Sequence, residues 1–185
     1  MVFQPASILT TITGEIFVQL KQHHPTLKLW TVVERNDALA TSNQIYFTFD
    51  ESAYGYIELL CRLAAYSLQD RHIYGKFYGK VSHLQLDPDL TFHDLQTTLK
   101  EVGLHCQFTI HFKPNFTPIF PGRCETCEPY EIAASSEELN HQFNIENDHP
   151  AYTQFAHQLT KDAITWIEHI TPLLRHQPPL AEDSQ

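Results

Sequence analysis

The stretch TFHDLQTTLKEVGLHCQFTIHF, residues 91–112, decides the fold class because it places a helix directly before a strand. Thr91 stands three residues before Asp94, as in a capping box, and Gly103 stands where a helix C-terminal cap belongs. From Leu104 onward apolar and polar side chains alternate, which is typical of a strand with one buried and one solvated face. The sequence therefore predicts an α+β protein.

On both sides of this unit, the periodicity of the apolar residues predicts further helices and strands. Apolar residues at helical spacing predict helices at residues 8–20, 52–69 and 150–171, and a capping-box pattern at Ser135 and Glu138 predicts another short helix. Segments rich in β-branched and aromatic residues predict strands at residues 27–33, 44–49 and 72–86. With residues 104–112, these segments make a sheet of about four strands.

The segment of residues 72–86 leaves two interpretations open. It repeats Tyr-Gly-Lys at Tyr74 and at Tyr78, and glycine inside a strand marks a bulge or a close approach of backbone. A hairpin centred at Gly79 would give a ferredoxin-like order of elements, but it leaves too few residues for two average strands and a turn. We therefore expect one long, bent strand.

Length and composition favour a single domain. The chain has 185 residues, of which 42% are apolar, enough to bury a sizeable core. The prediction is one α+β domain over residues 1–174, with a mixed sheet, helices packed on it and a helical C-terminal region. Residues 175–185 are predicted to form a flexible tail.

Charge and targeting signals restrict the partners and the compartment. The net charge of −10 argues against nucleic acid as a partner, because phosphate binding needs an excess of Lys and Arg. The segment 71–83 nevertheless has three basic residues and no acidic one: Arg71, Lys76 and Lys80. The first residues lack the basic start of a secretory signal, and no apolar run is long enough to cross a bilayer. We expect a cytoplasmic protein with reduced thiols, no membrane association and a protein partner.

Cys124 and Cys127 form a Cys-x-x-Cys pair, the one motif with metal-ligand spacing. A structural zinc ion usually has four ligands, so two more must come from elsewhere. His105, His111 and Cys106 cannot share one ion, because His111 lies about 20 Å from His105 along the same strand and Cys106 points to the opposite face. Only one of the three can therefore join the cysteine pair, and we take His105 as the candidate. The fourth ligand must come from elsewhere in the chain, for example His141, the candidate we take, or His149.

Two other interpretations of the cysteine pair stay open. A redox function would need a thiolate stabilised by positive charge, and the neighbouring Glu125 and Glu128 oppose this. The third interpretation is an inert pair in the proline-rich loop of residues 113–130.

No nucleophile elbow, phosphate loop or zinc-protease motif occurs in the chain, so no catalytic residue can be assigned. The sequence therefore favours a non-catalytic protein-interaction or assembly module. The alternative is a zinc-binding domain or a metal-dependent enzyme that uses the cysteine pair. A small-ligand pocket beneath the proline-rich loop is a third hypothesis.

Overall fold

The computed structural model describes residues 5–36, 40–50, 53–63, 71–84, 92–109, 130–142 and 149–175. In these ranges the chain forms three helices and seven strands. Their order is α1 (Pro5–His23), β1 (Lys28–Asn36), β2 (Ala40–Asp50), β3 (Ala53–Leu63), β4 (Arg71–Leu84), α2 (Phe92–Glu101), β5 (His105–Thr109), β6 (Tyr130–Ser135), β7 (Leu139–Gln142) and α3 (His149–Arg175).

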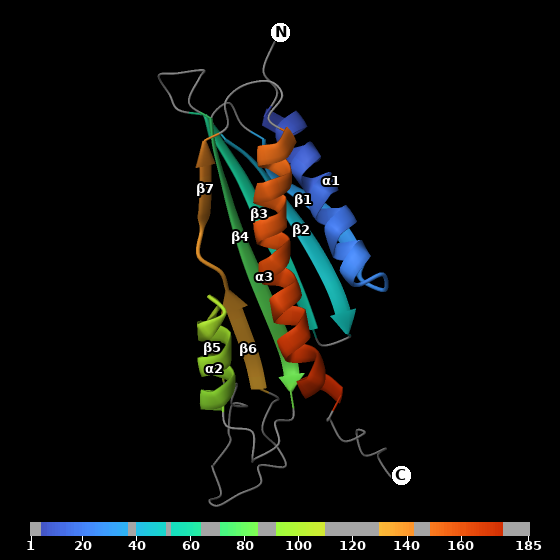
Figure 1. The fold of residues 1–185 in the computed structure, drawn as a ribbon, viewed down its shortest axis with the longest axis vertical. Helices are drawn as coiled ribbons and strands as arrows, with labels where there is room; N and C mark the ends of the chain where they lie inside the picture. Colours follow the sequence, from blue (N-terminus) through green and yellow to red (C-terminus); the bar gives the residue numbers. More distant parts are fainter. Residues whose placement is uncertain are drawn as a thin grey trace, which may run out of the picture.

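All seven strands belong to one sheet, in which every described pairing is antiparallel (Figure 1). The four longest strands follow one another in chain order from β1 to β4. Beyond β4, the sheet divides: β6 pairs with one end of β4 and β7 pairs with the other end. Finally, β5 pairs with β6 and completes the far side of the sheet. Short connections between successive long strands favour this antiparallel arrangement.

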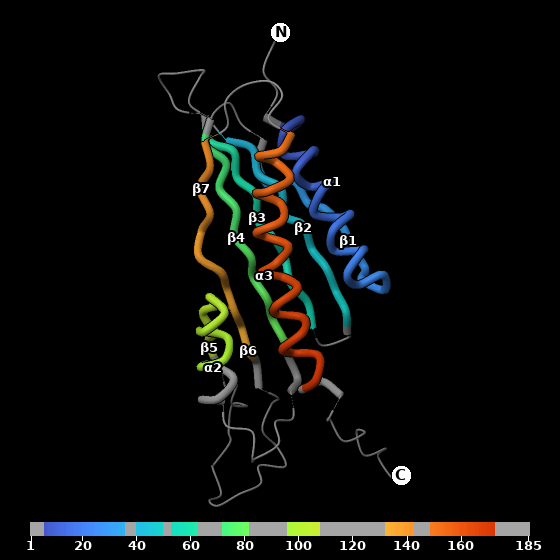
Figure 2. The backbone as a smooth tube through the Cα atoms, in the orientation of Figure 1, coloured from blue at the N-terminus to red at the C-terminus, as the bar shows by residue number. Residues whose placement is uncertain are grey.

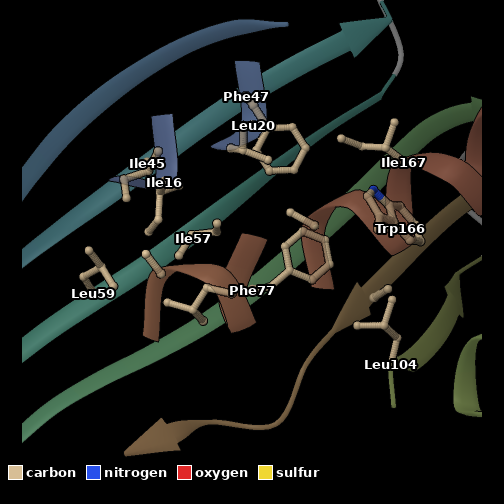
Figure 3. Close-up of a cluster of buried hydrophobic side chains, with 14 of the residues drawn as sticks. Ile16, Leu20, Ile45, Phe47, Ile57, Leu59, Phe77, Leu104, Trp166 and Ile167 are labelled. Carbon is tan, nitrogen blue, oxygen red and sulfur yellow. The ribbon is translucent and has the colours of Figure 1, made fainter. Parts of the chain in front are cut away.

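Helices α1 and α3 lie side by side on one face of the sheet (Figure 2). Helix α3 packs on β4 and β3, and α1 packs on β2 and β3. Their apolar stripes meet the alternate side chains of the strands in one buried cluster, which Figure 3 shows. Its largest fully buried side chains include Trp166 of α3, Phe47 of β2 and Phe77 of β4. This packing fixes which face of each strand is buried.

The predicted mixed sheet of about four strands is wrong: in the described residues the sheet has seven strands, and all their pairings are antiparallel. The largest error is the helix expected at residues 52–69, where the described part is strand β3. Ala53, Gly55, Ile57, Leu59 and Cys61 alternate into the core, and the residues between them point to the other face. Those outward positions also carry aromatic and aliphatic side chains, so the period of two is hidden and a helical spacing can be read instead.

The short helix predicted from Ser135, part of the expected helical C-terminal region, is also wrong. Ser135 ends β6, and Glu138 lies in the connection to β7. Ser136 in this connection is buried, and its backbone N–H donates to the Phe77 carbonyl at 3.1 Å. The Ser136 hydroxyl oxygen accepts a hydrogen bond from the Phe77 N–H, also at 3.1 Å. Ser136 therefore satisfies both backbone groups of Phe77 in β4, at the point where the sheet divides between β6 and β7.

We expect Ser136→Ala to lower the free energy of unfolding by about 1–3 kcal/mol, because it leaves the buried Phe77 N–H without its acceptor. Chemical denaturation of the two proteins measures the difference. Ser7→Ala, at an exposed position of α1, is the matched control and should stay within about 0.5 kcal/mol of the parent. Equal losses from both substitutions would show that the buried hydrogen bond contributes nothing.

Other predicted elements are confirmed. Helix α2 lies where the capping pattern placed it, and Gly103 ends it with φ of 85°, a conformation that side-chain-bearing residues rarely adopt. Strand β4 is one long strand of 14 residues and not a hairpin. Helix α3 runs past the predicted stop and contains Pro172.

Several predictions fall outside the described residues. These are the end of the strand expected at residues 110–112, the proline-rich loop with Cys124 and Cys127, and residues 176–185 of the expected tail. Arg175, the first residue of that tail, lies in α3. The single domain over residues 1–174 stays a prediction.

Candidate binding face

The sheet face opposite α1 and α3 is called the open face here. Alternation along each strand assigns its side chains, since those of the other parity enter the core. On β3 and β4, the described side chains of this face are partly or largely exposed. They are Tyr54, Tyr56, Glu58, Leu60 and Arg62 of β3, and His72, Tyr74, Lys76, Tyr78 and Lys80 of β4.

Four aromatic rings, one from each of the four long strands, form a continuous row across the open face. The strand register places Trp30 opposite Tyr46, Tyr46 opposite Tyr56, and Tyr56 opposite Tyr78. Their ring centroids are 5.7, 5.1 and 4.7 Å apart, with interplanar angles of 6°, 31° and 18°. We call Trp30, Tyr46, Tyr56 and Tyr78 the aromatic row. Each contact has the geometry of offset stacked or tilted rings.

This geometry determines what the aromatic row can offer a ligand. Because neighbouring rings are stacked on one another across the strands, the π-faces of Tyr46 and Tyr56 are occupied on both sides, and Trp30, at the edge of the sheet, keeps one free π-face. At the far end of the row, the Lys76 ammonium lies 5.2 Å from the Tyr78 ring centroid. The row therefore presents ring edges and tyrosine hydroxyl groups, and it is poorly suited to stacking a nucleic-acid base or a sugar ring.

The tyrosines of the row are neutral hydrogen-bonding groups. Burial raises the pKa of Tyr56 to about 12, with further contributions from Tyr78 and Glu58. Burial also raises the pKa of Tyr46 and of Tyr78, and Glu34 adds to the first shift and Glu58 to the second. All three phenols are thus protonated at neutral pH and can donate. The Tyr46 hydroxyl already donates to Gln44 Oε1 at 2.7 Å.

Basic side chains flank the aromatic row on β3 and β4. The Arg62 guanidinium lies 5.2 Å from the Tyr74 ring centroid, and Lys76 stands opposite Glu58 in the register. Among the described side chains of this face on these two strands, Arg62, Lys76 and Lys80 are basic and Glu58 alone is acidic. The part of the open face on β3 and β4 thus carries more basic than acidic side chains, on a chain with a net charge of −10.

The predicted zinc ligands are not brought together in the described part of the chain. His105 on β5 stands opposite Ser135 on the open face, and its Nε2 lies 3.8 Å from Glu137 Oε1. His141 on β7 stands opposite Ile73 on the helix-covered face, where its ring centroid is 6.4 Å from that of Phe155. Within the described ranges, no three His, Cys, Asp or Glu side chains are grouped to hold a metal ion. With Cys124 and Cys127 outside these ranges, the zinc site stays a prediction.

The other two cysteines are core residues. Cys61 and Cys106 are buried and are not joined in a disulfide. Burial raises the pKa of the Cys106 thiol to about 11, so the thiol is protonated at neutral pH and is a poor nucleophile or metal ligand.

Burial also keeps His24, just after α1, in its neutral form near pH 7, because burial lowers the pKa of its imidazole.

Sequence reasoning missed the aromatic row. The signal in the sequence was the even spacing of tyrosines at residues 54 and 56 and at residues 74 and 78. Even spacing places two tyrosines on the same face of one strand, whereas the aromatic row depends on the register between four strands.

Comparison with known proteins gives no significant match: no family model fits the chain, and no curated protein or solved structure is significantly similar to it. None of the described helices is long and apolar enough to cross a bilayer. The function must therefore be argued from the open face itself.

Proposed function

We propose that this chain is a non-catalytic protein-binding module whose open face contacts a partner protein. The observation that carries this proposal is the aromatic row, which lies on the sheet face opposite both long helices. Tyrosine and tryptophan are enriched at protein interfaces because each has a large apolar body and one polar group. A row of such side chains across four strands is a suitable centre for an interface.

The charges on the β3 and β4 part of the open face favour a partner with acidic groups around an apolar centre. Arg62, Lys76 and Lys80 lie beside the row, and the protonated tyrosine hydroxyls supply further donors to carboxylates and carbonyls. Stacking leaves little π-surface for bases or sugars, so a protein surface fits this face better than nucleic acid or carbohydrate. A cytoplasmic setting is part of the proposal, because Cys61 and Cys106 are core side chains that are not joined in a disulfide, as is usual in a reducing compartment.

A photo-crosslinking amino acid tests the proposal. It is placed at Tyr56 in the centre of the row and, as the matched control, at Gln22 on the exposed side of α1. We expect position 56 to form a covalent adduct with one partner in cells that make the protein, and position 22 to form none with that partner. The partner is then identified by mass spectrometry and purified.

Binding of the purified partner supplies the decisive measurement. Tyr56→Thr keeps a good strand former but removes the central ring. Loss of a central aromatic residue is expected to weaken the complex by at least about 2 kcal/mol, roughly 30-fold in Kd. Calorimetry measures this, and unfolding curves confirm that the variant is folded. Unchanged affinity in Tyr56→Thr, or equal adducts from positions 56 and 22, would remove the open face as the binding surface.

A further inference from the structure

Strand β1 is an edge strand that carries exposed apolar side chains. Among the described strands it pairs with β2 alone, so the outer side of its backbone has no neighbour in the described sheet. Trp30, Val32 and Val33 are 42%, 41% and 57% exposed, and they are three of the five large apolar side chains found exposed in the described residues. A long edge strand with such side chains is a template for pairing with another strand.

We infer that β1 pairs antiparallel with β1 of a second copy, about a two-fold axis that passes between the two Thr31 residues. In this register Trp30 stands opposite the second copy's Val32, and Lys28 lies next to its Glu34, the residue at the β-bulge between Val33 and Arg35. Leu29 stands opposite Val33, which is an apolar pair on the other face. Aromatic with β-branched pairs and opposite charges are favourable cross-strand neighbours. The two-fold axis makes each of these pairs occur twice.

The faces of β1 agree with this register. Lys28, Trp30 and Val32 pair in turn with Thr48, Tyr46 and Gln44 of β2, which lie on the open face. Glu34 also lies there, since it contributes to the raised pKa of Tyr46. Every charged or aromatic side chain of the proposed contact thus meets its counterpart on the same side of the joined sheet.

Neighbouring registers are less favourable. With the axis at Val32, Trp30 would stand opposite Glu34 and the Lys28–Glu34 pair would be lost. With the axis at Trp30, only residues 28–32 of each strand would overlap. The β-bulge between Val33 and Arg35 bends the end of β1 and opposes pairing further along the chain. The sequence of the strand therefore selects the register centred at Thr31.

The helix layer leaves room for the second copy. Helix α1 packs on β2 and β3. In the joined sheet the two β2 strands would be separated by three strand spacings, about 14 Å. Packed helices need only about 8–10 Å between their axes. Both α1 helices fit on the same face of the joined sheet. One π-face of Trp30 is stacked on Tyr46. The other π-face, toward the edge of the sheet, would then pack on Val32 of the second copy.

Sedimentation of charge-exchange variants tests the pairing, which does not depend on the proposed function. We expect the full chain to form dimers between about 1 µM and 1 mM. Lys28→Glu, and separately Glu34→Lys, should each weaken the dimer about tenfold, because each places like charges opposite one another twice. The double variant Lys28→Glu/Glu34→Lys should return the Kd to within about threefold of the parent. A monomer over the whole range, or no recovery in the double variant, overturns the inference.

Disulfide formation tests the register. In a Cys124→Ser/Cys127→Ser background, Thr31→Cys should crosslink two chains on oxidation, since directly opposed antiparallel residues have Cα atoms about 4.5–5.5 Å apart. Val32→Cys and Trp30→Cys are matched controls that report the two neighbouring registers. Crosslinking of Thr31→Cys well above both controls supports the axis at Thr31. Preferential crosslinking of either control, or none in any variant, overturns it.

Discussion

Gly79→Ala is expected to lower the free energy of unfolding by about 2 kcal/mol, although alanine is normally the better residue for folding. A Cβ atom at this position of β4 would lie 2.4 Å from Trp166 Cε2 and 2.5 Å from Trp166 Nε1. The indole is fully buried and rigid, so α3 or β4 must shift. Overpacking of this kind costs about 1–3 kcal/mol, more than the gain of about 0.4–1 kcal/mol from a less flexible unfolded chain.

The matched control is Gly14→Ala in α1. A Cβ atom there would meet no heavy atom within 4 Å, and the position is exposed within a helix. Alanine should therefore stabilise the protein by about 0.5–1 kcal/mol through its higher helix propensity. Urea denaturation of both variants measures the change in the free energy of unfolding, which we expect to be a loss in Gly79→Ala and a gain in Gly14→Ala. A gain, or no change, in Gly79→Ala would contradict the close approach of α3 to β4 at Gly79.

Trp166→Ala is expected to lower the free energy of unfolding by about 3–5 kcal/mol, the largest effect of any single substitution considered. Trp166 is fully buried, and its ring centroid lies 6.4 Å from that of Phe77. Its indole Nε1 is buried without a hydrogen-bond partner in the described part of the chain. Trp166→Phe should consequently cost much less, about 1–2 kcal/mol, since it keeps a ring and removes the unpaired donor. Denaturant unfolding of both variants measures the difference.

A double-mutant cycle connects these two predictions. With the indole removed, the Cβ atom of Gly79→Ala has space, so Gly79→Ala/Trp166→Ala should be more stable than the sum of the single effects by at least about 1 kcal/mol. Gly14→Ala/Trp166→Ala should be additive within about 0.5 kcal/mol, because Gly14 has no contact to relieve. Additivity in both cycles would show that residues 79 and 166 do not share one packing site.

The candidate site was less accessible to sequence reasoning than the fold. The basic residues of segment 71–83 were noticed, and Lys76 and Lys80 do lie on the open face. The cysteine pair received the most weight because spacing along the chain is visible without a structure. The aromatic row was missed because its members come from four strands, and only the register brings their rings together.

The sequence by itself determined the elements whose signals are local. The capping pattern and Gly103 defined α2, alternation defined β5, and the repeated apolar stripe defined α1 and most of α3. Such signals depend on residues a few positions apart, where backbone geometry links spacing directly to one face of a helix or strand.

The tertiary structure alone decided three features: that residues 53–63 form a strand, that Ser136 pairs β4 where the sheet divides, and that four distant aromatic residues form one row. Residues 53–63 have apolar or aromatic side chains at many positions of both faces, so the spacing of these residues does not distinguish a strand from a helix. The hydrogen-bonded pairing with β2 and β4 makes this segment a strand. Register and layer packing are properties of contacts between segments far apart in the chain, and this is the physical reason why they could not be read from local spacing.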